Sequence, residues 1–365
     1  MIPYGRQNLD EEDIAAVVDV LRGDWLTQGP TIERFEKSVA DYVGAEHAIA
    51  FSSGTAALHG AAWAAGLGPG DIVHTTPLTF IATVNAARHV GATPELVDID
   101  RKTWNIDLSL IPESSDAVIP VHYAGLPVDL SPGQWSHQPR VVIEDAAHAL
   151  GAHTPDGPVG NCAHSDMVCF SFHPVKPITT GEGGMVTTNN SELAERLRRF
   201  RSHGIVRKPE HGQWYYEVED LGYHYRMTDI QAALGLSQMR KLDAFISRRN
   251  ELANQYRRLL KHLPIELPPS APAGFSHGYH LFAVLVSERA RVFSELRARG
   301  IGVQVHYVPV HHHPSMKSLS SFPPALGNCE TVYSRVLSLP LHPRLTEFEQ
   351  EQTVVALEIA SDAGT

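Results

Sequence analysis

The chain has 365 residues, of which 43% are hydrophobic and 19% charged, the balance of an ordinary globular protein. This length exceeds what one hydrophobic core usually organises, so the sequence predicts two packed domains. The 41 acidic residues outnumber the 30 basic residues and give a net charge of −11. Such a charge argues against a nucleic-acid polymer or an anionic membrane as partner, because both require a basic face.

The first residues show no targeting signal. Arg6 is followed by the acidic run 10–13, and no apolar stretch follows a basic one, so we expect no signal peptide. No apolar run approaches the length of a membrane-spanning helix. The three cysteines, Cys162, Cys169 and Cys329, are odd in number and lack CxxC spacing, which favours a reducing compartment. The sequence therefore predicts a cytoplasmic protein.

Short apolar runs alternate with amphipathic segments through the first two-thirds of the chain. Several of these runs are apolar throughout, as in strands that are covered on both faces. We expect strands at 47–51, 71–75, 95–99, 117–121, 141–144, 167–171 and 185–188, and helices at 31–42, 55–65 and 80–89. This alternation predicts an α/β fold with a mostly parallel sheet sandwiched by helices.

The pattern changes after about residue 240. A long charged helix is expected over 241–262, and four prolines between 264 and 272 end it. Next we expect a strand at 280–286, a helix at 288–299, a strand at 303–307 and a last helix beginning near Glu347. The sequence thus predicts a large domain over 1–240 and a smaller α+β domain over 241–365.

The first motif with chemical meaning is FSSGTAAL at 51–58, where an expected strand turns into a helix. Gly54 permits close approach of a ligand, and the helix N-terminus with the Ser53 and Thr55 hydroxyls offers donors to a phosphate. Ordinary helix capping uses the same residue types. The motif alone therefore leaves both interpretations open.

The second motif is IEDAAH at 143–148, an apolar strand that ends in an acid. At the C-terminal end of a strand in an α/β sheet, Asp145 is expected to face the ligand crevice. A carboxylate there can keep the pyridine nitrogen of pyridoxal 5′-phosphate (PLP) protonated, and His148 could cover the ring or its phenolic oxygen. The alternative is an aspartate that caps a following helix.

The third motif, SFHPVKPITTGEGG at 171–184, is the most informative. Lys176 lies between Pro174 and Pro177, which restrict its loop, and glycines that permit close backbone contact follow it. Most lysines are solvated surface groups. A desolvated lysine amine, however, is the nucleophile that PLP chemistry requires for its Schiff base.

The motifs SSGTAAL, EDAAH, SFHPVK, TTGEGG and LGYHYRMTDIQAALG occur here in one order. Together they resemble the DegT/StrS-like sugar-nucleotide aminotransferases, which are fold-type I PLP enzymes. The similarity runs from Trp25 to His311. Within the family, SFHPVKPITT and PVHYAG are most similar to the 4-aminotransferases of pseudaminic acid biosynthesis.

The resemblance implies roles for individual residues. It implies that the catalytic residues are Lys176, which forms the Schiff base, Asp145 at the pyridine nitrogen and His148 near the ring oxygen. The cofactor-binding residues would be Ser53, Gly54, Thr55, Phe80, Asp145, His148, Ser171, Lys176, His224 and Arg226. Phe80 would stack on the cofactor ring, and Ser171, Gly54 and Thr55 would hold its phosphate. The substrate-binding residues would be Trp25, Thr27, Gln28, His173, Glu182, His306 and Tyr307.

Family members act as homodimers with shared active sites, which Arg226 would complete from the other chain. At position 224 this sequence has His where the family pattern has Asn, a residue that usually reaches the partner's phosphate. His224 either donates to that phosphate in place of the amide or packs at the interface.

The implied reaction moves an amino group from an amino acid, expected to be glutamate, to the C4 ketone of a nucleotide-linked sugar. The expected substrate is a UDP-linked 4-keto-6-deoxy-N-acetylhexosamine. A dTDP- or GDP-linked keto sugar and amination at C3 are the alternatives. Lys176 excludes the dehydratase branch of the family, whose members carry histidine at that position.

A run of histidines, His311–His313, with His306 before it, suggests a metal hydrolase as a competing class. Three adjacent rings cannot all point at one ion, and no HExxH or carboxylate pattern accompanies them. We expect exposed or substrate-lining histidines and no metal. A non-catalytic regulator with a PLP fold is the other competing class, against which Lys176 and Asp145 argue.

Overall fold

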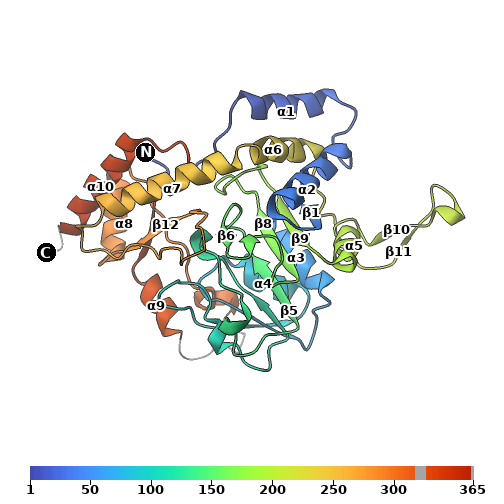
Figure 1. Ribbon diagram of the computed structural model, residues 1–365, viewed down its shortest axis with the longest axis horizontal. Helices are drawn as coiled ribbons and strands as arrows, with labels where there is room; N and C mark the ends of the chain where they lie inside the picture. The colour runs from blue at the N-terminus through green and yellow to red at the C-terminus, as the bar shows by residue number, and fades with distance from the viewer. Residues whose placement is uncertain (317–325, 363–365) are drawn as a thin grey trace.

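A seven-stranded sheet forms the centre of the computed structural model, which describes residues 1–316 and 326–362 (Figure 1). The strand order is β1-β9-β8-β5-β4-β2-β3, and only β9 runs antiparallel to its neighbours. The strands are β1 (His47–Phe51), β2 (Ile72–Thr75), β3 (Thr93–Leu96), β4 (Ala117–Ile119), β5 (Val141–Asp145), β8 (Met167–Ser171) and β9 (Gly184–Thr188). All seven were predicted, although β3 begins and ends earlier than expected. The mostly parallel α/β sheet is confirmed.

Helices cover both faces of this sheet. Along β8, Met167 and Cys169 face one apolar core while Val168 and Phe170 face another, as the two-residue period of a strand requires. The first core packs against α3 (Gly54–Ala64), α4 (Ala82–His89) and α5 (Ser191–Phe200); the second packs against α2 (Pro30–Val43) and α6 (Asp229–Met239). Outside α6 lies α1 (Glu11–Arg22).

The C-terminal region begins with α7 (Leu242–Leu259), which lies end to end with α6 in Figure 1. An antiparallel pair, β12 (Phe282–Leu285) and β13 (Val336–Leu339), packs there with α8 (Arg289–Ala298) and α10 (Glu347–Asp362). A short helix, α9 (Gly327–Tyr333), packs in a separate core that residues of the large sheet region and of the C-terminal region share. The predicted domain boundary at 240/241 falls between α6 and α7, and we retain it as a proposal.

One predicted strand of this region is wrong. Residues 303–307 make only an isolated bridge, from Gln304 to Ser338. The Nδ1 atom of His306 pairs with Ser338 Oγ at 2.9 Å, and the Tyr123 hydroxyl donates to the His306 carbonyl. These tertiary bonds take the place of a ladder: the first joins the segment to β13 and the second joins it to the large region.

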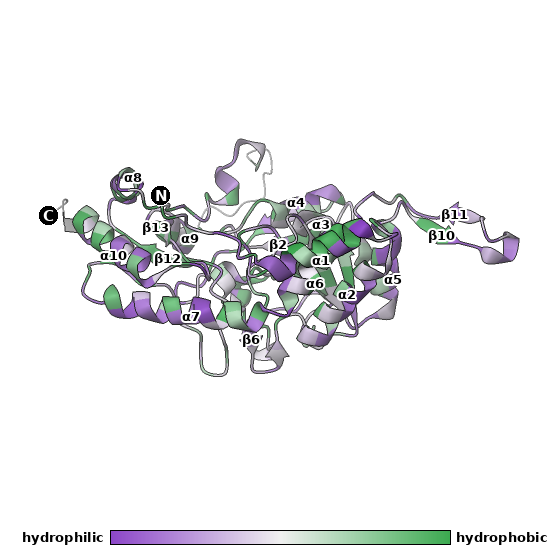
Figure 2. Ribbon diagram, turned by 90° about the horizontal axis from the view of Figure 1, so that it is seen from above, coloured by the Kyte–Doolittle hydropathy of each residue, from purple (hydrophilic) through white to green (hydrophobic). Residues whose placement is uncertain are grey.

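A hairpin of β10 (Ile205–Arg207) and β11 (Tyr216–Val218) projects from the body, far from the C-terminal region (Figures 1 and 2). Its tip leaves Trp214 78% exposed. A second small hairpin joins β6 (His153–Thr154) to β7 (Gly157–Pro158). Within residues 1–316 and 326–362, no helix combines the length and apolar composition of a membrane span.

Candidate active site

A cavity of about 400 Å³ opens at the C-terminal ends of the parallel strands, where α/β sheets bind their ligands. Strands β5 and β8 end in it with Asp145 and Ser171, and α3 begins there. The C-terminal region closes another side. The lining residues are Tyr4, Ser53, Gly54, Thr55, Leu58, Thr79, Phe80, Ala82, Val121, Asp145, Ala147, His148, Ser171, His173, Val175, Lys176, Glu182, His280, His306 and Tyr307.

Lys176 lies in the loop between β8 and β9, in a turn closed by its own N–H to the His173 carbonyl at 2.9 Å. The side chain is partly buried. Desolvation lowers the pKa of its amine to about 8, while the charge of Asp145 opposes this shift. Much of the amine is therefore neutral, and so nucleophilic, in mildly alkaline solution.

Asp145 is fixed at the strand end by two hydrogen bonds. Its Oδ2 atom accepts from the Thr83 hydroxyl at 2.7 Å, and its Oδ1 atom accepts from the Ala147 N–H at 3.1 Å. The residue is 5% exposed. Because turns rather than a helix follow β5, the alternative that this aspartate caps a helix is wrong.

His148 belongs to a group of uncharged rings beside the lysine. Its Nε2 atom lies 3.0 Å from the Tyr307 hydroxyl, and its ring centroid lies 4.3 Å from that of His280. Burial, followed by the charge of Lys176, holds the pKa of His148 well below its usual range, and the same causes lower the pKa of His306 to about 3. The buried Nδ1 atom of His148 has no hydrogen-bond partner among the described residues, so it can still bond a ligand.

The N-terminus of α3 forms the polar end of the cavity. Ser53 caps the helix, its Oγ accepting from the Ala56 N–H at 3.1 Å. A Cβ on Gly54 would lie only 2.8 Å from the Ser171 Cβ, so glycine is what lets β8 and α3 meet here. The capping and phosphate interpretations are thus compatible, because a capped helix end that opens into a cavity attracts anions.

Twelve of the predicted site residues line this one cavity: Ser53, Gly54, Thr55, Phe80, Asp145, His148, Ser171, His173, Lys176, Glu182, His306 and Tyr307. Phe80 precedes α4 instead of beginning it, and its side chain stays 56% exposed. The Phe80 ring centroid lies 5.9 Å from that of Tyr307, and an exposed flat ring on the cavity wall suits stacking. The individual roles stay predictions.

Five predicted residues lie outside the cavity of their own chain. Trp25 lines a separate hollow beside α1, α2 and α6, while Thr27 and Gln28 are exposed near Thr228. His224 is exposed with its ring 5.5 Å from that of His203, and Arg226 is partly exposed. Their predicted roles need a second chain or a bound substrate and stay predictions.

Sequence reasoning missed Tyr4, Thr83 and His280. Thr83 lies in the same short motif as Phe80. It comes three residues after Phe80 in an expected helix, and this spacing could have indicated that the two share a face. Tyr4 lies near the N-terminus and His280 lies in the C-terminal region, and no sequence signal places them beside Lys176.

These observations fit PLP. The cavity is large enough for a small cofactor. Around it lie a lysine, a strand-end carboxylate, a helix N-terminus, an exposed aromatic ring and a buried ring nitrogen that has no partner in the described part of the chain. The fold and site together define a PLP-dependent enzyme of fold type I.

Comparison with known proteins gives the family. The sequence pattern of the DegT/DnrJ/EryC1/StrS aminotransferase family matches residues 7–358. The chain belongs to this family and is a sugar aminotransferase that uses PLP.

Relatives extend over the whole chain. The spore coat polysaccharide biosynthesis protein SpsC of Bacillus subtilis is 38% identical, covering 98% of this chain and 96% of SpsC. Spr1654 of Streptococcus pneumoniae, described as a sugar aminotransferase and solved in its PMP form, has a TM-score of 0.93 at 28% identity over all of both chains. PseC of Helicobacter pylori, an aminotransferase involved in pseudoaminic acid biosynthesis, has a TM-score of 0.91 at 32% identity over 99% of each chain.

Proposed function

We propose that this enzyme transfers the amino group of L-glutamate to the C4 ketone of a UDP-linked 4-keto-6-deoxy-N-acetylhexosamine, a sugar of the pseudaminic acid type. The placement of Lys176 beside Asp145 in one cavity carries the aminotransfer part of this proposal. The likeness to PseC, spread over nearly all of both chains, supports the sugar.

Each residue has a distinct task in this proposal. When bound, PLP supplies a protonated ring that accepts electrons from the substrate carbon. Asp145, oriented by Thr83, would hold the proton on the ring nitrogen. Lys176 would hold the cofactor and, once released, take and return the substrate proton at its Nζ. Ser171 and the start of α3 would hold the phosphate.

The uncharged wall of His148, His306 and His280 serves the same lysine. A cation beside Lys176 would favour its neutral form, yet would also repel a protonated amino donor. Burial keeps these rings neutral instead. The amine of Lys176 can therefore gain and lose its proton without a second positive charge from these rings beside it.

We also propose a homodimer that works in the cytoplasm. His224 and Arg226 lie outside their own cavity, and the projecting hairpin exposes Trp214, as expected if these elements serve a second chain. The cysteines are free and buried, in keeping with a reducing compartment.

A different nucleotide-linked keto sugar is the second candidate. It is favoured by SpsC, which is more similar in sequence than PseC and is named for spore coat polysaccharide biosynthesis. The test is a panel of UDP-, dTDP- and GDP-linked 4-keto and 3-keto sugars, each supplied with glutamate. We expect the highest kcat/KM with the UDP-linked 4-keto sugar and a new amine at C4 by NMR. Preference for another nucleotide, or an amine at C3, would contradict the proposal.

A further inference from the structure

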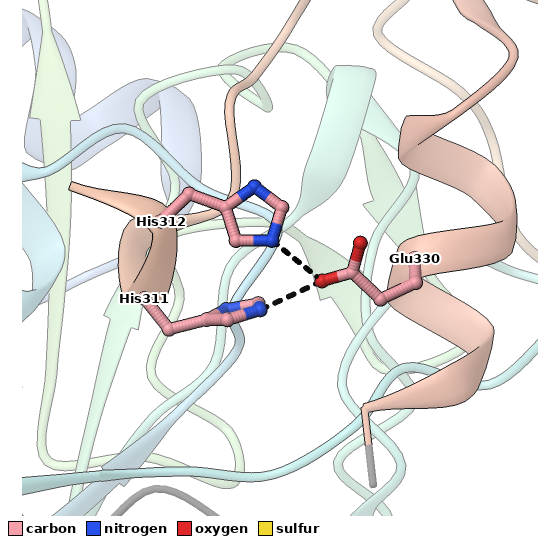
Figure 3. A group of neighbouring side chains, drawn as sticks. All are labelled: His311, His312 and Glu330. Atoms are coloured by element: carbon pink, nitrogen blue, oxygen red, sulfur yellow. Dashed lines mark hydrogen bonds and ion pairs between the residues drawn. The ribbon is translucent and has the colours of Figure 1, made fainter. Parts of the chain in front are cut away.

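Two of the three consecutive histidines point toward one carboxylate, that of Glu330 on α9 (Figure 3). Nε2 of His311 lies 2.7 Å and Nε2 of His312 lies 2.8 Å from the same oxygen, Oε1. The two ring centroids are 4.5 Å apart, with the planes inclined by 74°. The ligand atoms of the three residues all lie within 4.8 Å of one another. Two separate segments of the chain thus direct their side chains to one point.

Both segments are held in position before any ligand arrives. The short 3₁₀ turn η5 (Val310–His312) buries Val310 in the same core as Cys329 of α9. The N–H of Val310 donates to the Pro77 carbonyl at 3.0 Å. In the first turn of α9, the N–H groups of Asn328 and Cys329 each donate to the Asp98 carboxylate at 2.9 Å. Little ordering is left for a ligand to impose.

We propose that His311, His312 and Glu330 bind a divalent transition metal ion, with zinc as the representative ion. Two imidazoles and one carboxylate are a donor set of open zinc sites, which hold the ion about 2.0–2.2 Å from each ligand atom. Donors around a tetrahedral ion lie roughly 3.4 Å apart. A modest rotation of the His312 and Glu330 side chains therefore opens the cluster enough to admit the ion.

The expectation of no metal had two grounds: three adjacent rings cannot all point at one ion, and no HExxH or carboxylate pattern accompanies them. The proposed site needs only two of the adjacent rings, and Glu330 supplies the carboxylate from a helix further along the chain. The side chains of His312 and Glu330 are 36% and 43% exposed, which leaves an entry path and room for water on the remaining coordination positions.

The proposed site is separate from the chemistry. Among the residues that the structure describes, none of the three lines the cavity of Lys176. The turn η5 nevertheless follows directly on the segment that carries His306 and Tyr307. A bound ion would join this segment to α9 and stabilise the cavity wall without touching a reacting atom.

Calorimetric titration of zinc chloride into untagged, chelator-treated holoenzyme tests this site. We expect one ion per chain and a higher Tm with zinc. Replacing zinc with cobalt should give the visible absorbance of a low-coordinate cobalt site. For His312→Ala and Glu330→Gln we expect affinity to fall by more than the roughly 10- to 100-fold that loss of an outer-shell partner costs.

Two controls separate this site from general histidine binding. His313→Ala removes the neighbouring ring, and His262→Ala removes an exposed histidine paired with only one carboxylate, that of Glu358; both should bind zinc as the parent does. Unchanged Tm values without zinc would show that the variants fold. The proposal is overturned if the parent takes up no stoichiometric zinc, or if Glu330→Gln and His312→Ala bind it equally well.

Discussion

The sheet region and the C-terminal region contribute to the cavity in different ways. From the sheet region come Lys176, Asp145 and Ser171, each at or just after a strand end. The C-terminal region contributes His280, His306 and Tyr307, all from irregular segments held by tertiary hydrogen bonds. The first group has the charges and the nucleophile, and the second forms an uncharged wall. We therefore expect substitutions in the sheet region to affect chemistry and those in the C-terminal region to affect its environment.

The largest effect is expected from Lys176→Ala. Its amine combines cofactor attachment with proton transfer, and proton transfer alone contributes roughly 10²–10⁴-fold, so turnover should fall by more than that range. The visible absorbance of the lysine-bound cofactor should also disappear, while the far-UV circular dichroism stays unchanged. Lys37→Ala, at a lysine whose side chain is 74% exposed, is the control. Normal turnover in Lys176→Ala would refute the assignment of the whole site.

The second largest effect is expected from Asp145→Asn. Its kcat should fall by roughly 10²–10³-fold, the range for removing one preorganised electrostatic contact. A neutral amide cannot hold the ring proton, but it still fills the space, so cofactor binding should survive. Thr83→Val sharpens the test, because it leaves the carboxylate and removes the hydroxyl that donates to Oδ2 at 2.7 Å, together with that hydroxyl's contacts to Thr79 and the Phe80 carbonyl. Its loss should be smaller, about tenfold. Equal losses in both variants would show that the carboxylate's position, and not its charge, matters.

The lowered pKa of Lys176 predicts a pH dependence. Below pH 8 the amine of the cofactor-free enzyme is mostly protonated and unreactive, so the rate of PLP attachment should rise with pH and level off above about 8. An ordinary lysine would continue to gain reactivity up to about pH 10.4. The contribution of Lys176 to folding stability also rises with pH. The unfolded chain binds the lysine proton more tightly than the folded chain does, so this rise occurs between about pH 8 and the ordinary lysine pKa of about 10.4. Stopped-flow absorbance against pH measures the attachment rate.

Tyr307→Phe tests the C-terminal wall. It removes a hydroxyl 3.0 Å from His148 Nε2 but leaves the ring, and one neutral hydrogen bond is worth about 1 kcal/mol. We expect a change of roughly fivefold in kcat/KM, far below that of the strand-end variants. A loss as large as that of Asp145→Asn would contradict the expectation that the C-terminal region affects the environment of the reaction and not its chemistry.

His224→Asn should have the smallest effect, and only in a dimer. If the imidazole donates to the partner's cofactor phosphate, an asparagine amide at this position can donate in its place, whereas an alanine cannot. Cofactor retention on dialysis should then be kept in His224→Asn and reduced in His224→Ala. Equal retention in both variants would favour simple packing of His224.

The sequence predicted most of what depends on local order. Apolar runs located all seven strands of the main sheet, and motifs at strand ends located Lys176, Asp145 and the start of α3. It failed where distant contacts override local pattern. Residues 303–307 read as a strand, yet bonds to Ser338 and Tyr123 hold them otherwise. His280 and Tyr4 could not be assigned to the site, because only the packing of the folded chain brings them to the cavity of Lys176.

The first residues of the chain connect the two regions a second time. Ile2 exchanges hydrogen bonds with Gly300 and Gly302 in the C-terminal region, whereas the Asn8 carbonyl accepts from Gln238 of α6. Between them, Tyr4 lines the cavity. The regions are therefore linked by two covalent crossings, one through residues 5–7 and one between α6 and α7. If the two regions move relative to each other, two such tethers favour rotation about the line that joins them over other directions of motion.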